Sequence, residues 1–396
     1  MTRCLVYAAY SFNGTGPAQS CASIVAHFPP ELSTEVYLAR ARTPLPANVR
    51  VHESLPPLVR RLPWRIVARH ADRAVDRAFL RALRRNAPAD TVVYVWPGSP
   101  QRIIEAAHRR GFPVVREMIN SACATSGPIL DEAYRSLDMA PSHGVSAEVI
   151  RGETSELLTY DYLFASNPEV EKSLIALGIS SRKIRPTAFG WDPDRFTDST
   201  PATPLAHGVR ALFVGTIGVR KGIPGLLRAW QEADIDGELV LAGRVEPDVA
   251  ELVDSYLRHG RVRLTGYVSD IGSLYRSADF FVFPTFEEGG PQVTYEAAGC
   301  GLPVITTPMG AARLVESERS GLVVAAGEHD QLRQALLSMA GNAEQRRRWG
   351  AEARRRAAEF TYQRVGRQRG EQLAEIAGQW RSDRRSQDPN ENRMQP

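Results

Sequence analysis

Cysteine is scarce in this chain of 396 residues, which contains only four. Cys4, Cys21, Cys123 and Cys300 show none of the spacings that are typical of metal sites, and a chain of this length does not depend on a disulfide framework. We interpret them as reduced thiols of a cytosolic protein. The sequence therefore predicts neither a structural disulfide nor a bound metal.

Long apolar runs are also missing, since none approaches the roughly 20 residues that cross a bilayer. The N-terminal run is short and enters a glycine-containing turn at residues 11–17, so a first β-strand fits it better than a signal peptide. The net charge of +4 is too small to indicate nucleic acid as a partner. Hydrophobic residues make up 43% and charged residues 24% of the chain, which is typical of a globular protein with room for two domains.

Apolar runs alternate with helical patterns along most of the chain. This alternation predicts parallel sheets covered by helices on both faces, as in doubly wound α/β domains. A polar, proline-containing stretch at residues 196–208 predicts an interdomain linker. We place a first domain at residues 1–200, a second at 201–370, and a helix end with a disordered tail at 371–396. The expected strands are residues 4–10, 91–96, 113–118, 162–165, 210–216, 238–242, 261–265, 280–284, 303–306 and 321–324.

Two acids that lie eight positions apart are the most informative feature of the second half. Glu288 lies in a glycine-rich loop, and Glu296 lies inside the helix predicted to follow it. Pro291 suits the first helical position, and the free amides and positive dipole end of the next residues make an anion site. A phosphate at this helix start, flanked by two carboxylates, indicates a nucleotide-sugar diphosphate as the ligand.

This segment resembles the donor-site signature of the retaining glycosyltransferases of family 4. The matching elements are Glu288-Gly289, Glu296-Ala297 and Gly301-Leu302-Pro303-Val304. The resemblance implies a GT-B fold, in which two doubly wound, Rossmann-like domains face each other across a cleft and the C-terminal helix crosses back to the first domain. It also implies that Glu288 positions the donor sugar and Glu296 holds the ribose. The alternative is an ordinary strand–loop–helix crossover with surface glutamates.

A glycine-bearing turn after the strand expected at 210–216 resembles the phosphate loop of the same family. Lys221-Gly222 match it, whereas Thr216 stands where the family often has arginine, and Arg220 is the candidate substitute. Lys221 would neutralise the leaving diphosphate, and the alternative is an exposed basic pair. We expect Lys221 and Glu288 to be catalytic, with no cofactor beyond a nucleoside-diphosphate sugar as co-substrate. The predicted donor-binding residues are Gly215, Thr216, Arg220, Lys221, Gly289, Gly290, Gln292, Val293 and Glu296.

The first domain offers weaker signals for an acceptor site. Many relatives place a histidine after the strand that corresponds to residues 113–118, and this chain has none there. Polar and glycine residues in three loops are the candidates to line the cleft instead, although each has a purely structural alternative. The expected acceptor-side residues are Asn13, Gly14, Gly16, Glu117, Asn120 and His143.

Arginine recurs at every fourth position from 61 to 85, which places a basic ridge along a predicted helix. One interpretation is contact with an anionic lipid surface, or with a pyrophosphate-linked acceptor, at the inner face of a membrane. The alternative, which we favour from sequence, is a solvated face whose arginine stems cover the core. Nucleic acid is not expected, because no aromatic stacking pattern accompanies the arginines.

The whole pattern favours a cytoplasmic, retaining glycosyltransferase that moves a sugar from a nucleoside diphosphate to a hydroxyl of an acceptor that the sequence does not name. No dedicated base is evident, which suits a route in which the leaving phosphate accepts the acceptor's proton. Two alternatives stay open. One is a nucleotide-sugar-hydrolysing epimerase of the same fold, which needs carboxylates in the first domain, and the other is a catalytically silent sugar-nucleotide-binding protein.

Overall fold

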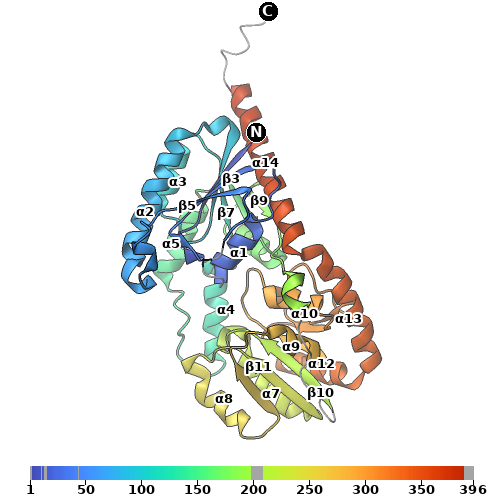
Figure 1. Ribbon diagram of the computed structural model, residues 1–396. Helices are drawn as coiled ribbons and strands as arrows, with labels where there is room; N and C mark the ends of the chain where they lie inside the picture. The colour runs from blue at the N-terminus through green and yellow to red at the C-terminus, as the bar shows by residue number, and fades with distance from the viewer. Residues whose placement is uncertain (1, 10, 13–15, 43, 198–207, 388–396) are drawn as a thin grey trace, which may run out of the picture.

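Two parallel β-sheets, one above the other, form the centre of the protein (Figure 1). The computed structural model describes residues 2–9, 11–12, 16–42, 44–197 and 208–387. The first sheet has the strand order β5-β3-β1-β6-β7-β8-β9, and the second has the order β12-β11-β10-β13-β14-β15. The neighbouring strands in both sheets run parallel, as the alternation of strands and helices predicts.

The first sheet belongs to the N-terminal half of the chain. Its strands are β1 (Arg3–Tyr7), β3 (Ser33–Leu38), β5 (Val49–Glu53), β6 (Thr91–Val95), β7 (Val114–Glu117), β8 (Tyr162–Ala165) and β9 (Ile184–Pro186), while β2 (Ser11–Phe12) pairs with β4 (Arg40–Ala41). The helices are α1 (Gly16–Val25), α2 (Trp64–Arg85), α3 (Gln101–Arg109), α4 (Cys123–Arg135), α5 (Ala147–Leu157) and α6 (Pro168–Ala176). Short 3-10 helices are η1 (Val59–Arg61), η2 (Pro88–Asp90), η3 (Ser181–Lys183) and η4 (Pro193–Phe196).

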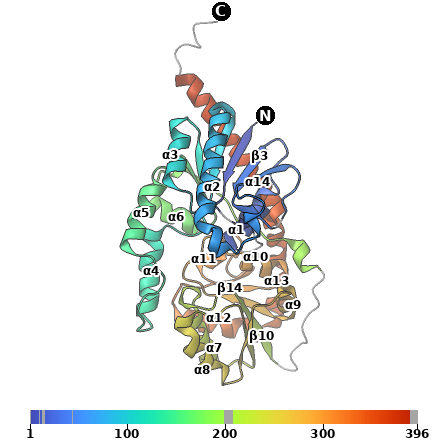
Figure 2. The same cartoon turned by 60° about the vertical axis from the view of Figure 1, so that its left-hand side comes forward.

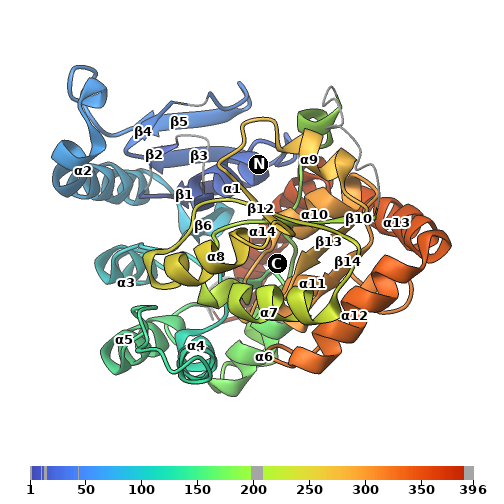
Figure 3. The ribbon, with the colours of Figure 1, turned by 90° about the horizontal axis from the view of Figure 1, so that it is seen from below.

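The second sheet begins after the linker. Its strands are β10 (Val209–Val214), β11 (Gly237–Ala242), β12 (Val262–Gly266), β13 (Phe280–Phe283), β14 (Val304–Thr306) and β15 (Gly321–Val323). The helices are α7 (Ile223–Ala233), α8 (Ala250–Leu257), α9 (Ile271–Ser277), α10 (Gln292–Gly299), α11 (Pro308–Ala311), α12 (His329–Gly341), α13 (Ala343–Ala357) and α14 (Tyr362–Gln387), with 3-10 helices η5 (Val219–Lys221), η6 (Pro247–Val249) and η7 (Ala358–Phe360). Helix α7 packs against α12, and α10 packs against α13 (Figure 3).

All ten strands expected from sequence are present, most of them shorter by one or two residues. Central strands such as β6, β7, β13 and β14 are buried at every position, because helices cover both faces of each sheet. Three strands of the first sheet were not predicted: β3, β5 and β9. Strands β5 and β9 lack the continuous apolar run by which the other strands were recognised, and in β3 the apolar run at residues 36–38 follows three polar residues.

Helix α14 crosses back from the second domain and runs along the first, as the resemblance implies (Figure 1). Arg369 in this helix forms an ion pair with Glu117 at the end of β7, and neither side chain is more than 1% exposed. Tyr94 also donates a hydrogen bond to Glu117. The expectation that Glu117 lines the cleft is therefore wrong, because its carboxylate is enclosed in the core where it anchors the C-terminal helix.

Two further expectations need correction. Within the segment 371–396, for which a helix end and a disordered tail were predicted, α14 continues to Gln387, and Arg381 donates a hydrogen bond to the carbonyl of Ala89 at 2.8 Å. Phe196, which was predicted to open the linker, is buried at the end of η4. Residues 198–207, which contain the predicted domain boundary, and 388–396 lie outside the described residues.

Helix α4 extends from the first domain toward the second (Figure 2). Tyr134, near its C-terminal end, donates a hydrogen bond of 2.7 Å to Asp248 in η6, so this helix bridges the two domains. No helix in the described part of the chain is both long enough and apolar enough to cross a membrane.

The ion pair between Glu117 and Arg369 gives a prediction about stability. Replacing Arg369 with Met leaves an unpaired carboxylate in the core, which we expect to lower the free energy of unfolding by about 3–5 kcal/mol. Arg367→Met is the matched control, because Arg367 pairs with Glu371 on the exposed face of the same helix, and we expect a change of about 0.5 kcal/mol or less. Urea denaturation followed by circular dichroism measures both, and equal midpoints for the two variants would contradict the anchoring role.

Candidate active site

Glycine shapes the loop that follows β10. Gly222 has a φ of +72°, and a Cβ atom at this position would lie 2.1 Å from the carbonyl oxygen of Pro284. Only glycine adopts this backbone conformation at so close an approach. Gly215, at the start of the loop, also has a positive φ, of +145°, and Thr216 follows it. The tip of the loop, η5, therefore lies directly against the end of β13.

Two hydrogen bonds attach this tip to the loop after β13. The amide of Phe286 donates to the carbonyl of Arg220 at 2.9 Å, and the hydroxyl of Thr285 donates to the same oxygen at 3.2 Å. The two loops consequently bring two consecutive cations, Arg220 and Lys221, next to two consecutive acids, Glu287 and Glu288. We call this group of four residues the charge cluster.

The inner pair of the charge cluster joins the two residues predicted to be catalytic. Lys221 forms an ion pair with Glu288, and Lys221 is only 6% exposed. Its ammonium also lies 5.5 Å from the ring centre of Phe283. Burial lowers the pKa of Lys221 well below its ordinary value, Arg220 acts in the same direction, and Glu287 opposes them. A bound anion would stabilise the charged form of this lysine.

The outer pair of the charge cluster contains a residue to which sequence reasoning gave no role. Glu287 is 2% exposed and accepts hydrogen bonds at 3.1 Å from both the amide and the hydroxyl of Ser121 in the first domain. Its second oxygen accepts a hydrogen bond of 2.9 Å from Arg220. Glu287 thus joins the first domain to the loop that follows β10 in the second. The sequence carried no signal for this role, since Ser121 is 166 positions away.

The second acid of the signature lies apart from the charge cluster. Glu296 is in α10, where the hydroxyl of Tyr275 donates to it at 3.1 Å and Arg195 contacts it at 3.5 Å. Burial raises the pKa of Glu296, while Arg195 and Tyr275 oppose that shift. Glu288 and Glu296 share no hydrogen-bond partner among the described residues. Arg195 was missed because it lies in a segment that reads as unstructured in the sequence.

The start of α10 differs slightly from the prediction. Pro291 precedes the helix instead of occupying its first position, and Gln292 and Val293 are its first two residues. The side chain of Gln292 donates a hydrogen bond to the hydroxyl of Ser20 in α1, so this helix start faces the first domain.

The two glycines of the signature loop also contact the first domain. A Cβ atom on Gly289 would lie 2.0 Å from the carbonyl oxygen of Ile119, and one on Gly290 would lie 1.9 Å from the ring of Phe189. The carbonyl of Gly289 accepts a hydrogen bond of 2.8 Å from Asn167. Close interdomain packing therefore requires glycine at both positions.

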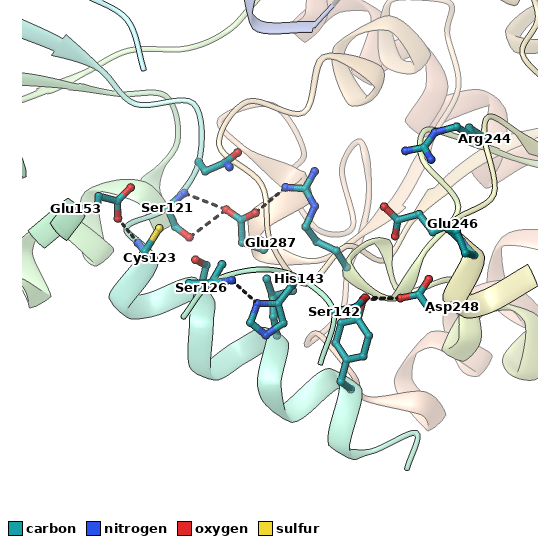
Figure 4. A pocket seen from close by; sticks show the side chains of 16 residues that line it. Ser121, Cys123, Ser126, Ser142, His143, Glu153, Arg244, Glu246, Asp248 and Glu287 are labelled. Carbon is teal, nitrogen blue, oxygen red and sulfur yellow. Dashed lines mark hydrogen bonds and ion pairs between the residues drawn. The ribbon is translucent and has the colours of Figure 1, made fainter. Parts of the chain in front are cut away.

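The predicted acceptor-side residues are distributed over several places. Asn120 and His143 line a cavity of about 640 Å³ between the domains, together with Arg220 of the charge cluster (Figure 4). Gly16 is the first residue of α1. Asn13 and Gly14 lie outside the described residues.

Comparisons with known proteins give a family match in the second half of the chain. Residues 208–342 match the family "Glycosyl transferases group 1". The O-antigen chain mannosyltransferase B of Escherichia coli is 41% identical over 110 residues, which cover 26% of this chain and 29% of that protein. The curated relatives that this chain matches are covered over about 29 to 53% of their own lengths.

Solved structures extend the comparison to the whole chain. The structure of Anabaena Alr3699/HepE in complex with UDP and glucose has a TM-score of 0.66 at 16% identity, and the match covers 95% of this chain and all of that one. WaaG, a glycosyltransferase involved in lipopolysaccharide biosynthesis, has a TM-score of 0.63 at 17% identity over 94% of this chain and 99% of its own. The fold is GT-B. The charge cluster and Glu296 lie inside the matched group 1 domain of this GT-B protein.

The contacts of Glu287 predict a role in holding the two domains together. In Glu287→Ala, Ser121 and Arg220 lose the acceptor that they share, and we expect the free energy of unfolding to fall by about 2–4 kcal/mol. We also expect a larger radius of gyration in small-angle scattering, because the cleft opens more often.

Ser121→Ala is the matched control, since it removes the hydroxyl donor alone and leaves the backbone amide in place. We expect it to cost about 1 kcal/mol. A Glu287→Ala variant with the wild-type radius of gyration and stability would show that the contact does not hold the domains together.

Proposed function

We propose that this protein is a retaining glycosyltransferase that transfers a sugar from a nucleoside-diphosphate sugar to an acceptor hydroxyl. The observation that carries the proposal is the buried ion pair between Lys221 and Glu288, at the junction of the two loops that follow β10 and β13. The family match over residues 208–342 supports it. The E. coli relative is named a mannosyltransferase, and the HepE structure contains UDP and glucose.

Each donor-side group has a role in this proposal. Lys221 would place its positive charge on the diphosphate, and the amides at the start of α10 would contribute the positive end of the helix dipole. With these charges we expect no metal to be needed. Glu288 would then exchange Lys221 for the hydroxyls of the donor sugar, and Glu296 would accept hydrogen bonds from the ribose.

The proposed reaction proceeds on one face of the sugar. The bond between the anomeric carbon and the phosphate oxygen breaks, and a bond from that carbon to the acceptor oxygen forms on the same side. The acceptor's proton passes to the departing phosphate oxygen, so no protein base is required. The enclosure of Glu117 in an ion pair with Arg369 removes the first-domain carboxylate that an epimerase would need, which favours the transferase.

Turnover tests the proposal directly. We expect the wild-type protein to hydrolyse its preferred nucleotide sugar slowly and to transfer the sugar when an acceptor is added. Nuclear magnetic resonance of the product should show the same anomeric configuration as in the donor. Lys221→Ala and Glu288→Ala should each lower kcat by at least about a hundredfold, because each removes charge or positioning at the leaving group. EDTA should leave the rate unchanged.

The outcomes separate the alternatives. Binding of a nucleotide sugar without any turnover would favour the silent binding protein. An inverted product would exclude the front-face route. The control for nonspecific effects of removing a carboxylate is Glu251→Ala, because Glu251 is exposed on α8. The turnover rate of this variant should equal that of the wild type.

We further propose that the start of α2, together with the segment around η1 before it, holds the protein at an anionic membrane surface. Leu58, Leu62 and Ile66 are 80%, 42% and 55% exposed, and they lie beside the exposed side chains of Arg61 and Arg65. The opposite side of α2 is buried in the first domain. Exposed apolar groups that alternate with arginines suit the interface of an anionic bilayer, and a cytoplasmic membrane face would supply it. These exposed apolar residues favour membrane contact over the purely solvated face that the sequence suggested.

Vesicle binding tests this membrane contact. We expect the wild type to sediment with phosphatidylglycerol vesicles and not with phosphatidylcholine vesicles. Leu62→Ser with Ile66→Ser should weaken that binding about tenfold or more, because two apolar side chains no longer enter the bilayer. Val149→Ser with Leu158→Ser removes a similar exposed apolar area near α5 and should have no effect. Equal binding by both double variants would contradict the proposal.

A further inference from the structure

The cavity between the domains is lined on one side by the first domain and on the other by the second. Helix α4 and the segment that carries His143 form one side, and the loop after β11 forms the other (Figure 4). Its volume of about 640 Å³ is in the range of pockets that bind small molecules. Arg220 and Glu287 form its inner wall. We call it the α4 cavity.

The α4 cavity adjoins the proposed reaction site through the charge cluster. Arg220 and Glu287 face the cavity, and the next residue in each loop, Lys221 and Glu288, forms the inner pair. Glu246 also lines the cavity, and a Cβ atom built on Gly218 would lie 1.8 Å from its carboxylate. Glu246 therefore lies over the start of the phosphate loop. A molecule in the α4 cavity would approach the donor from the side of Arg220.

The far wall of the cavity carries the carboxylate of Asp248, which two residues of the opposite side hold in place. Asp248 receives hydrogen bonds on one oxygen, from Tyr134 at 2.7 Å and from Ser142 at 2.9 Å. Its other oxygen is buried and has no hydrogen-bond partner in the described part of the chain. Because this oxygen is enclosed by protein atoms, a molecule in the cavity does not contact it, and Asp248 contributes its negative charge to the lining.

The charge of the lining selects against anions. The lining contains four carboxylates and two guanidinium groups. The carboxylates are those of Glu153, Glu246, Asp248 and Glu287, and the guanidinium groups are those of Arg220 and Arg244. Arg220 is already paired with Glu287. Carboxylates accept hydrogen bonds from hydroxyl groups and repel phosphate or carboxylate groups. Hydroxyl and amide groups, among them those of Ser126 and Asn120, and apolar side chains such as Leu130 and Val145 complete the lining. Such a surface suits an uncharged molecule with many hydroxyls.

We propose that the α4 cavity binds a neutral carbohydrate portion of the acceptor and discriminates against phosphorylated or acidic sugars. The proposal rests on the proposed function, because it places this carbohydrate beside the donor sugar. Glu246 is the residue that sets the discrimination, since its carboxylate lies nearest to the phosphate loop. Any phosphate-containing part of an acceptor would have to lie outside this cavity.

Binding measurements with matched sugars test the proposal. The probes are methyl mannoside, glucose and N-acetylglucosamine, each compared with the corresponding 6-phosphate, and affinities are measured by saturation-transfer nuclear magnetic resonance with UDP or GDP present. We expect at least one neutral sugar to bind, with a Kd about tenfold or more below that of its phosphate. Glu246→Gln should reduce this discrimination about fivefold, because it removes one negative charge at nearly constant shape. Glu251→Gln, on the exposed surface of α8, should not change it.

Three results would overturn the proposal: no neutral sugar binds, a phosphorylated sugar binds as well as its neutral partner, or Glu246→Gln leaves the discrimination unchanged. The test is distinct from that of the proposed function. Failure of UDP, GDP and every nucleotide sugar to bind would reject the transferase, whereas neutral sugars that fail to bind while the donor turns over would reject the cavity assignment alone.

Discussion

The contact between the loop after β10 and the loop after β13 is the constraint on which the candidate site depends. It pairs two neighbouring cations with two neighbouring acids, and the outer acid reaches across to Ser121 of the first domain. Lys221 and Glu287 are buried and Glu288 is nearly so, whereas Arg220 is half-buried, and charged groups that are buried are stable only when each has a partner. The position of Lys221 is therefore set by Glu288 beside it, while the position of Arg220 is set by Glu287 and, through Glu287, by the other domain.

Most of the fold could be predicted from the sequence because a buried parallel strand is a continuous apolar run. Strands β3, β5 and β9, which were not predicted, depart from this pattern for physical reasons. Glu35 interrupts β3, where it is buried and accepts a hydrogen bond from Tyr37. Strands β5 and β9 form the two edges of the first sheet, where one side is uncovered and polar residues or proline are tolerated. Strand β3 is buried at five of its six positions but begins with polar residues, whereas the edge strands β5 and β9 are each fully buried at one position only.

The candidate site could be predicted only where its residues are close in the chain. Glu288 and Glu296 lie on one loop and helix, so their spacing carries information that a single sequence can show. The partners Arg195, Ser121 and Arg369 come from distant segments, and nothing in their neighbourhood marks them. Glu117 shows the converse error, because a polar residue at the carboxyl end of a parallel strand ordinarily faces a ligand. Here a basic side chain from the crossing helix enters the same space and encloses it.

The presence of glycine at positions 289 and 290 has two physical explanations, and the sequence alone cannot distinguish between them. One is close approach of a ligand to the backbone, and the other is close approach of the first domain. The contacts with Ile119 and Phe189 establish the second, and the carbonyl of Gly289 is held by Asn167 as well. Because Glu288 directly precedes Gly289, the first domain positions the loop that carries this acid. The proposed donor site is therefore a product of both domains, and its geometry is complete only when they are closed on each other.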